Sequence, residues 1–187
     1  MSAARRIACE RLTPEAFAPF GTVIEAGRGE VRAINAGTCE RHHALAAIEH
    51  AAGRRPILSI FRAQPRALPM ELAMMERHPL GSQAFVPLSG EAWIAVVAPD
   101  EGGGPGAPRA FLAGGRQGVS YAANVWHHPL IALGGVRDFL VADADGPEPN
   151  LEEADYPVPY MLAAPGEAAA EAGSGAEPGR EAWEDQA

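Results

Sequence analysis

The sequence has few cysteines, few basic residues and no long apolar run. Two cysteines, Cys9 and Cys39, are too few and too irregularly placed for a disulfide framework or a cysteine-rich zinc site. The 15 Lys and Arg residues against 24 Asp and Glu residues give a net charge of -9, which disfavours binding to nucleic acid or to an anionic membrane. No stretch reaches transmembrane length, and the N-terminus lacks the apolar core of a signal peptide. We therefore expect a soluble, cytoplasmic protein with no nucleic-acid or membrane partner.

Glycine and proline are abundant instead, and they divide the chain into short apolar runs. The 187 residues include 21 Gly and 17 Pro. Short strands every eight to twelve residues with turn signals between them favour a closed barrel or a sandwich. One helix of about two turns is expected after Thr13, which offers a hydroxyl cap before Pro14. Residues 41–50 fit either a helix or an extended segment.

The composition changes near residue 163. The segment 164–187 is rich in Ala, Gly, Glu and Pro and has almost no branched apolar residues. Such a segment cannot bury enough apolar surface to offset the entropy cost of ordering. We expect one domain over residues 1–163 and a disordered acidic tail over 164–187.

Residues 76–97 hold the most informative pattern in the chain. A polar entry with Glu76 and His78 leads into an apolar strand, 82–88, in which Pro87 indicates an edge or a bulge. Ser89 and Gly90 form a turn signal. A nearly continuous apolar strand over 92–98, typical of a strand buried on both faces, follows. The pattern predicts a β-hairpin with ligand and acid–base groups at its mouth.

The histidines and their neighbours offer the chemistry. Glu76 and His78 are two residues apart, so their side chains share a face on a strand, and Gln83 enters the next strand. His127 and His128 are adjacent, so only one of them can face a given pocket. A Glu, His, Gln and His set can hold a divalent metal such as nickel, zinc, manganese or iron. The same set can serve in proton transfer without a metal, and the plain alternative is a group of surface residues.

The arginines are ambiguous from the sequence alone. Arg62 follows an apolar strand and precedes a Pro-rich loop, where it is either a surface charge or an anchor for a carboxylate, to which its planar donor fork is suited. Arg41, beside two histidines, has the same two interpretations. The sequence contains no phosphate-binding loop and no serine or cysteine nucleophile motif.

Four stretches, in order, resemble the ureidoglycolate lyase family. They are LTPEAFAPFGTVIE followed by INAG, SIFRAQPRALP at 59–69, ERHPLGSQAFVPLSGEAWIAVVA at 76–98 and GVSYAANVWHHPLIAL at 118–133. The resemblance spans roughly residues 10–160. It implies a mainly β, cupin-like double-stranded β-helix (a jelly-roll-type barrel) with a few short helices, and a homodimer.

The resemblance also implies a reaction and a set of site residues. The family splits (S)-ureidoglycolate into glyoxylate and urea, a late step in the use of allantoin from purines as a nitrogen source. On that basis His78 and His127 are the expected acid–base pair, with Glu76 beside them. The expected substrate-binding residues are Arg62, Gln83, Asn35, Arg41, Tyr121 and Trp126. A divalent metal such as Ni²⁺ is left open, with His78, Gln83, His127 and Glu76 as its ligands.

Three other functions remain open at this stage. A ureidoglycolate hydrolase would release ammonia and carbon dioxide from the same substrate. A cupin-like module without enzymatic activity would bind a small acid. A metal-dependent cupin oxygenase or isomerase is the third alternative.

Overall fold

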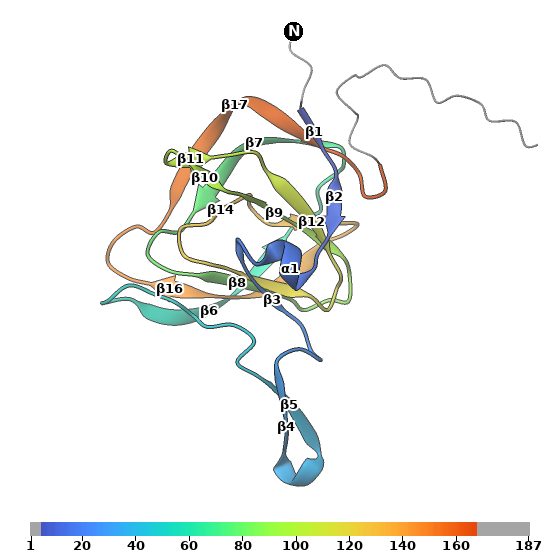
Figure 1. Ribbon diagram of the computed structural model, residues 1–187, viewed down its shortest axis with the longest axis vertical. Helices are drawn as coiled ribbons and strands as arrows, with labels where there is room; N and C mark the ends of the chain where they lie inside the picture. Colours follow the sequence, from blue (N-terminus) through green and yellow to red (C-terminus); the bar gives the residue numbers. More distant parts are fainter. Residues whose placement is uncertain (1–4, 168–187) are drawn as a thin grey trace, which may run out of the picture.

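Two β-sheets face each other and form a barrel (Figure 1). The computed structural model describes residues 5–167. The eight-stranded sheet runs in the order β1 (Arg5–Ile7), β17 (Glu152–Leu162), β7 (Met70–Arg77), β14 (Trp126–His127), β9 (Trp93–Ala98), β12 (Arg109–Ala113) and β2 (Cys9–Arg11), with β15 (Ile131–Ala132) also paired to β9. The five-stranded sheet runs in the order β3 (Gly21–Ile24), β13 (Gly118–Tyr121), β8 (Gln83–Pro87), β16 (Arg137–Asp145) and β6 (Arg55–Ala63). This arrangement confirms the prediction of a mainly β, cupin-like barrel.

The strand β9 explains how the core is divided. All six of its residues are buried, and successive side chains point to opposite faces of the sheet. Trp93, Ala95 and Val97 pack into the cluster between the two sheets. Ile94 and Val96 pack into a second cluster, on the opposite face of the eight-stranded sheet, which also contains side chains of β17. Because both faces are covered, the sequence of β9 is apolar throughout, as expected for a central strand.

The predicted hairpin over residues 82–98 is wrong. The strand β8 pairs with β13 and β16, whereas β9 pairs with β12, β14 and β15, so the chain crosses from one sheet to the other at Ser89 and Gly90. The prediction that Pro87 marks an edge or a bulge is also wrong. Pro87 is the last residue of a central strand, where its missing N–H removes nothing from the interior of the ladder.

The short helix α1 (Pro14–Phe17) begins where the sequence predicts it. The Thr13 hydroxyl accepts a hydrogen bond from the Ala16 N–H at 3.2 Å, which satisfies one of the free donors of the first turn. The helix has only four residues, fewer than the two turns expected. Phe17, fully buried, anchors it against the core between the sheets.

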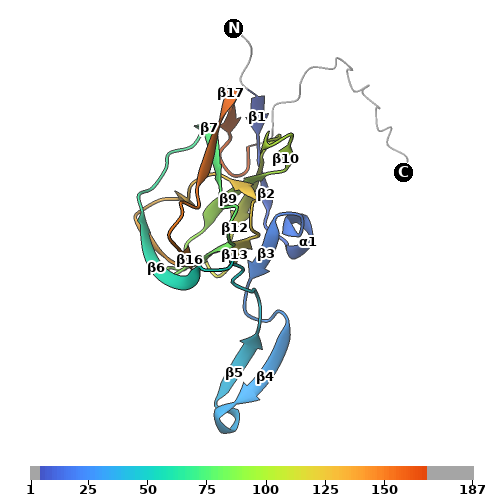
Figure 2. The same ribbon diagram turned by 90° about the vertical axis from the view of Figure 1, so that its left-hand side faces the viewer.

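A two-stranded hairpin projects from the barrel (Figure 2). Its strands are β4 (Glu30–Ile34) and β5 (Cys39–His43), joined by the 3-10 turn η1 (Asn35–Gly37), and they pair only with each other. We call residues 30–43 the arm. The arm shows that the first part of the ambiguous segment 41–50 is extended. No helix in the described part of the chain has the length and apolar character needed to cross a membrane.

Several strands have no counterpart in the sequence prediction. Among them are β1, β2, β17 and the pair β10 (Asp100–Glu101) and β11 (Gly104–Pro105), which lies in a segment rich in glycine and proline. The strand β17 contains two prolines, which argue against a regular strand. Both prolines lie within the irregular segment between Asp155 and Tyr160, where the register with β7 shifts. Most of the predicted tail, residues 168–187, lies outside the described residues.

Candidate functional site

The pairing of β14 with β7 places a histidine opposite a glutamate inside the barrel. His127 is directly opposite Glu76 on one side and Val97 on the other. Directly opposed residues share a face of the sheet, and Val97 belongs to the core between the sheets. The His127 side chain is only 2% exposed, and its Nε2 lies 3.5 Å from Glu76 Oε1. The fold therefore holds a buried imidazole against a carboxylate whose side chain is 20% exposed.

His78 completes the group from the connection between β7 and β8. Its ring centroid lies 5.2 Å from that of His127. One atom able to bind a metal from each of Glu76, His78 and His127 lies within 4.8 Å of the corresponding atoms of the other two. These are the three residues that the sequence predicts as catalytic, and the structure brings them together.

Hydrogen bonds to backbone carbonyls orient both imidazoles. His127 Nδ1 donates to the Val125 carbonyl at 2.9 Å, and His78 Nδ1 donates to the Asn150 carbonyl. A carbonyl oxygen can only accept, so Nδ1 carries a proton in each ring. In the neutral form the lone pair is then on Nε2. Both Nε2 atoms are buried and have no hydrogen-bond partner among the described residues.

The electrostatics of the site disfavour an ordinary ion pair. Burial lowers the pKa of His127 to about 3, so this imidazole is neutral near pH 7. Burial also raises the pKa of Glu76, although the nearby His78 opposes that shift. When Glu76 is ionised, the 3.5 Å contact joins two acceptors, the His127 Nε2 lone pair and a carboxylate oxygen, and a cation or a donor group of a substrate would satisfy both. When Glu76 is protonated, its carboxyl group can donate to His127 Nε2.

The five-stranded sheet supplies the facing wall. The Tyr121 ring stacks on His127 with centroids 4.3 Å apart and planes 14° apart. Gln83 is directly opposite Tyr121, so its side chain shares that face of the sheet, and its Oε1 is buried without a partner among the described residues. The register of β16 with β8, continued by one step, places Asp143 beside Gln83, and Asp143 Oδ1 is likewise buried and unpartnered within residues 5–167. Two further acceptors therefore face the interior.

A cleft of about 480 Å³ leads to Glu76 from the solvent. Its lining includes Phe61, Arg62, Arg66, Glu76, Phe85 and Leu130. Arg62 is held in a two-bond fork by Asp138, with both N···O distances 2.8 Å, and this pairing lowers the pKa of the Asp138 carboxyl. The Arg66 side chain forms no hydrogen bond or ion pair with any residue of the described range 5–167. Of the two cations at the mouth, Arg66 is the one whose donors are free.

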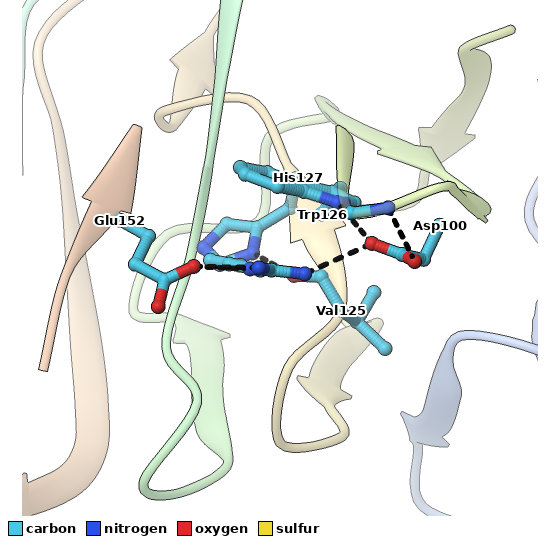
Figure 3. Close-up of polar contacts among 7 residues, drawn as sticks. Asp100, Val125, Trp126, His127 and Glu152 are labelled. Carbon is cyan, nitrogen blue, oxygen red and sulfur yellow. Dashed lines mark hydrogen bonds and ion pairs between the residues drawn. The ribbon is translucent and has the colours of Figure 1, made fainter. Parts of the chain in front are cut away.

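The structure does not bring Trp126 to this site. Because it neighbours His127 on β14, its side chain points to the opposite face and packs in the second core cluster. Its indole N–H donates to Asp100 Oδ1 at 2.9 Å (Figure 3). The Arg77 guanidinium lies 4.3 Å from the centroid of the indole ring and pairs with Asp100 and Glu152. Trp126 thus stabilises the outer face of the sheet behind the histidine.

Asn35 and Arg41 are also outside the site of their own chain. Both lie on the arm, which projects away from the barrel (Figure 2). The cleft that leads to Glu76 is lined by neither of them. Asn35 has a positive φ of 52° in the η1 turn, a conformation that asparagine tolerates better than most residues.

Three residues of the site escape prediction from the sequence. Arg66 is only four residues after Arg62, and the sequence SIFRAQPRALP contains both. Asp143 alternates with the buried Phe139 and Val141 of β16, and an acid on the apolar face of a strand is a signal that could have identified it. Asn150, which contacts His78, lies in a polar turn that gives no sign of its partner.

The donor atoms fit a divalent metal. Two imidazoles and the Glu76 carboxylate converge here, and imidazole and carboxylate are ligands accepted by nickel, zinc, manganese and iron. The backbone carbonyls that bind the Nδ1 protons are the outer partners typical of histidine ligands. The Nε2 atoms of His78 and His127, unpartnered within the described part of the chain, are the observation that supports this fit.

Comparison with known proteins agrees with this geometry. The chain is 57% identical over 155 residues to a ureidoglycolate lyase from Rhizobium etli strain CIAT 652, an alignment covering 82% of this chain and 93% of that protein. It is 58% identical over 155 residues to a ureidoglycolate lyase from Agrobacterium fabrum, with the same coverage, and 53% identical over 160 residues to ureidoglycolate lyase 1 from Rhizobium meliloti, covering 85% and 94%. A family model described as ureidoglycolate lyase matches residues 4–163. The chain therefore belongs to the ureidoglycolate lyase family.

Proposed function

We propose that this protein splits (S)-ureidoglycolate into glyoxylate and urea. The observation that carries the proposal is the convergence of two imidazoles, whose Nε2 atoms are free of partners among residues 5–167, on the Glu76 carboxylate, which also lines a cleft with two arginines. The substrate is a small anion with several N–H and O–H donors. Its groups match the acceptors inside the barrel and the cations at the mouth.

The reaction needs one proton removed and one proton supplied. The central carbon of ureidoglycolate bears a hydroxyl, a carboxylate and a ureido nitrogen. Loss of the hydroxyl proton lets the C–O bond become the carbonyl of glyoxylate while the C–N bond breaks. The electron pair of that bond goes to the ureido nitrogen, which takes up a proton to give urea. No oxidant, reductant or water is consumed.

His127 and its neighbours are suited to both proton steps. The neutral His127 imidazole has its lone pair on Nε2, where it can accept the hydroxyl proton; burial makes this nitrogen a weak base, so the imidazolium gives the proton up readily. His78 and Glu76 lie beside it and can return a proton to the departing nitrogen. Burial raises the pKa of Glu76, which favours a carboxyl able to donate. Tyr121 fixes the plane of the His127 ring by stacking.

A divalent metal such as Ni²⁺ is compatible with the same residues. His78, His127, Glu76 and Gln83 would hold it, and when bound it would polarise the substrate oxygen. The imidazoles would then act as ligands, and they would no longer be free as bases. Metal analysis of protein purified without added ions, followed by chelation and an activity assay, distinguishes the two roles.

The substrate carboxylate is proposed to bind at the mouth of the cleft. Arg66 has free donors there, within the described part of the chain, whereas two donors of Arg62 are occupied by Asp138. We assign Arg66 as the main anchor and Arg62 as its support. A guanidinium matches a carboxylate in charge and in planar geometry.

The ureido group is proposed to face the interior acceptors. Its N–H groups are donors, and Gln83 Oε1 and Asp143 Oδ1 are buried acceptors without partners among residues 5–167. A site rich in acceptors favours a ligand end rich in donors. This pairing would orient the nitrogen to be released toward the histidines.

A second copy of the chain is the proposed partner. The outer face of the five-stranded sheet carries the row Ile60, Leu140 and Val86, with Leu58 beside it. Leu58 is 69% exposed and Ile60 is 56% exposed, and contiguous exposed apolar residues commonly mark an interface. In such a homodimer the arm would extend toward the partner, where Asn35 and Arg41 could serve its site. Ile60→Asp is expected to convert a dimer measured by sedimentation into a monomer, and a monomeric wild type would contradict the proposal.

The products test the proposed function directly. Incubation with (S)-ureidoglycolate is expected to give urea and glyoxylate in equal amounts, measured by urease-coupled and dehydrogenase-coupled assays. Release of ammonia without added urease would instead indicate a hydrolase. Binding of the substrate with no product would indicate a binding module.

A further inference from the structure

The connection between β7 and β8 is held by several distant segments, and Asn150 is the residue that binds both the His78 side chain and the backbone beyond it. Residues 78–82 form this connection, which carries His78 into the site, and backbone hydrogen bonds also join it to Asn124, Ala51 and Glu49. The Asn150 backbone carbonyl accepts the His78 Nδ1 proton, and the Asn150 side-chain Oδ1 accepts the Leu80 N–H at 2.7 Å. Asn150 therefore binds the connection on both sides of Pro79.

The two histidines of the site differ in how they are oriented. The carbonyl that binds His127 belongs to Val125, two residues away in the same segment. The carbonyl that binds His78 belongs to a residue 72 positions away, between β16 and β17. A distant carbonyl stays in place only if its own segment is fixed. The hydrogen bond from Leu80 to the Asn150 side chain fixes the segment at Asn150 itself, and the Arg54 guanidinium holds it two residues earlier through the Glu148 carbonyl at 2.9 Å.

We propose that Asn150 is a positioning residue that sets the orientation and tautomer of His78. Its side chain anchors the 146–151 segment to Leu80, and its carbonyl then keeps the proton of His78 on Nδ1. Because Nδ1 is occupied by this carbonyl, Nε2 is the ring nitrogen of His78 left to act on a group held between it, Glu76 and His127. This inference rests on the proposed function, since it assigns His78 a role in that reaction.

A near-isosteric substitution tests the role of the side chain. Asn150→Leu removes the acceptor for the Leu80 N–H and keeps a similar volume, whereas Asn150→Asp keeps a carboxylate oxygen as the acceptor. Loss of an outer partner of a reacting histidine commonly costs about 10- to 100-fold in activity. We expect kcat of Asn150→Leu to fall by about tenfold with KM nearly unchanged, and kcat of Asn150→Asp to stay within about threefold of the wild type. A purely structural role would lower stability without this split between kcat and KM.

A spectroscopic measurement provides a second readout independent of turnover. Long-range ¹H–¹⁵N correlation spectra of the imidazoles report which nitrogen carries the proton. His78 is expected to be protonated on Nδ1 in the wild type and in Asn150→Asp, and to show a mixture of tautomers in Asn150→Leu. Asn150→Ala provides the same test if the leucine variant fails to fold.

The outcomes separate this inference from the proposed function. An active wild type together with an Asn150→Leu variant of unchanged kcat and unchanged His78 tautomer would overturn only the role of Asn150. Equal losses of kcat in the Asn150→Asp and Asn150→Leu variants would overturn it as well, because the acceptor retained in Asn150→Asp should preserve the activity. A wild type that releases no urea would overturn the proposed function itself.

Discussion

Replacing His127 by asparagine is the substitution that separates its chemistry from its structural role. The asparagine amide can reproduce the donor at Nδ1, and thus the hydrogen bond to the Val125 carbonyl. It has no group at the position of Nε2, which is the atom that faces Glu76. The substitution therefore removes the reacting nitrogen while the carbonyl keeps its donor.

The expected effects on activity and on stability differ in size. A positioned acid or base commonly contributes about 10²- to 10⁴-fold, so kcat/KM for urea release should fall by at least about 100-fold. His127 is 2% exposed and stacks on Tyr121, so truncation leaves a small void. Complete truncation of buried aromatic side chains costs about 3–5 kcal/mol. The asparagine side chain would fill part of the space, and we expect a loss of about 2 kcal/mol in the free energy of unfolding.

The assay combines urea release with urea-induced unfolding followed by circular dichroism. His50→Asn is a matched control, because His50 is exposed and its Nδ1 contacts only the carbonyl of the next residue. The control should keep kcat/KM within about twofold of the wild type. If His127→Asn retained more than about a tenth of the wild-type kcat/KM, proton transfer or metal binding by His127 would be refuted.

Three further predictions concern the cleft, the outer face and the pH dependence of stability. Arg66→Ala should raise KM by about tenfold, because a charged contact at a solvent-exposed position contributes only modestly to binding. Arg62→Ala should raise KM less, and equal increases in steady-state assays would contradict the assignment of Arg66 as the main anchor. Trp126→Phe should lose the hydrogen bond to Asp100 and lower the free energy of unfolding by about 1 kcal/mol. Its kcat/KM should stay within about twofold of the wild type. A large loss of activity would show that Trp126 does contribute to the site. The pH prediction applies to protein kept in a metal chelator. In the unfolded chain His127 binds a proton below its ordinary pKa near 6.5, whereas in the folded protein it does so only near pH 3, so the free energy of unfolding should fall as the pH is lowered from 6.5 toward 3. Denaturation curves of His127→Asn should lack this part of the decrease.

The sequence predicts most of the long strands because their signals are local. The strands predicted over 82–88 and 92–98 are observed as β8 and β9 within one residue at each end, and apolar runs bounded by turn residues are also visible at β6, β12, β13 and β16. The strand β17 is missed because its acidic start and its prolines suggest a loop. Its stability depends on pairing with β7, which lies far earlier in the chain, and no local pattern reports such a partner.

Local sequence signals predict where a strand lies, but they do not predict the sheet to which the strand belongs. A turn at Ser89 and Gly90 fits a hairpin and a crossing between sheets equally well from sequence. The partners of β8 and β9 all lie further along the chain, beyond intervening turns, so the choice depends on long-range packing. The prediction of a hairpin is wrong for this reason, although both of its strands are present.

The candidate site follows the same division between local and distant information. Alternation on a strand places His127 and Trp126 on opposite faces of β14, and this rule excludes Trp126 from the side on which His127 lies. The contacts of Asn150 with His78 and Leu80 join segments about 70 residues apart. The projection of the arm, which removes Asn35 and Arg41 from the cleft, is likewise visible only in the fold (Figure 2).

The most direct test of the central claim follows both fragments of the substrate in one experiment. Ureidoglycolate labelled with ¹³C at the ureido carbonyl and at the central carbon can be observed by NMR during turnover by the wild-type protein. We predict that the ureido label appears entirely in urea and the central carbon in glyoxylate and its hydrate, at equal rates. Appearance of the ureido label in bicarbonate, with ammonia released in parallel, would contradict cleavage of the C–N bond at the central carbon.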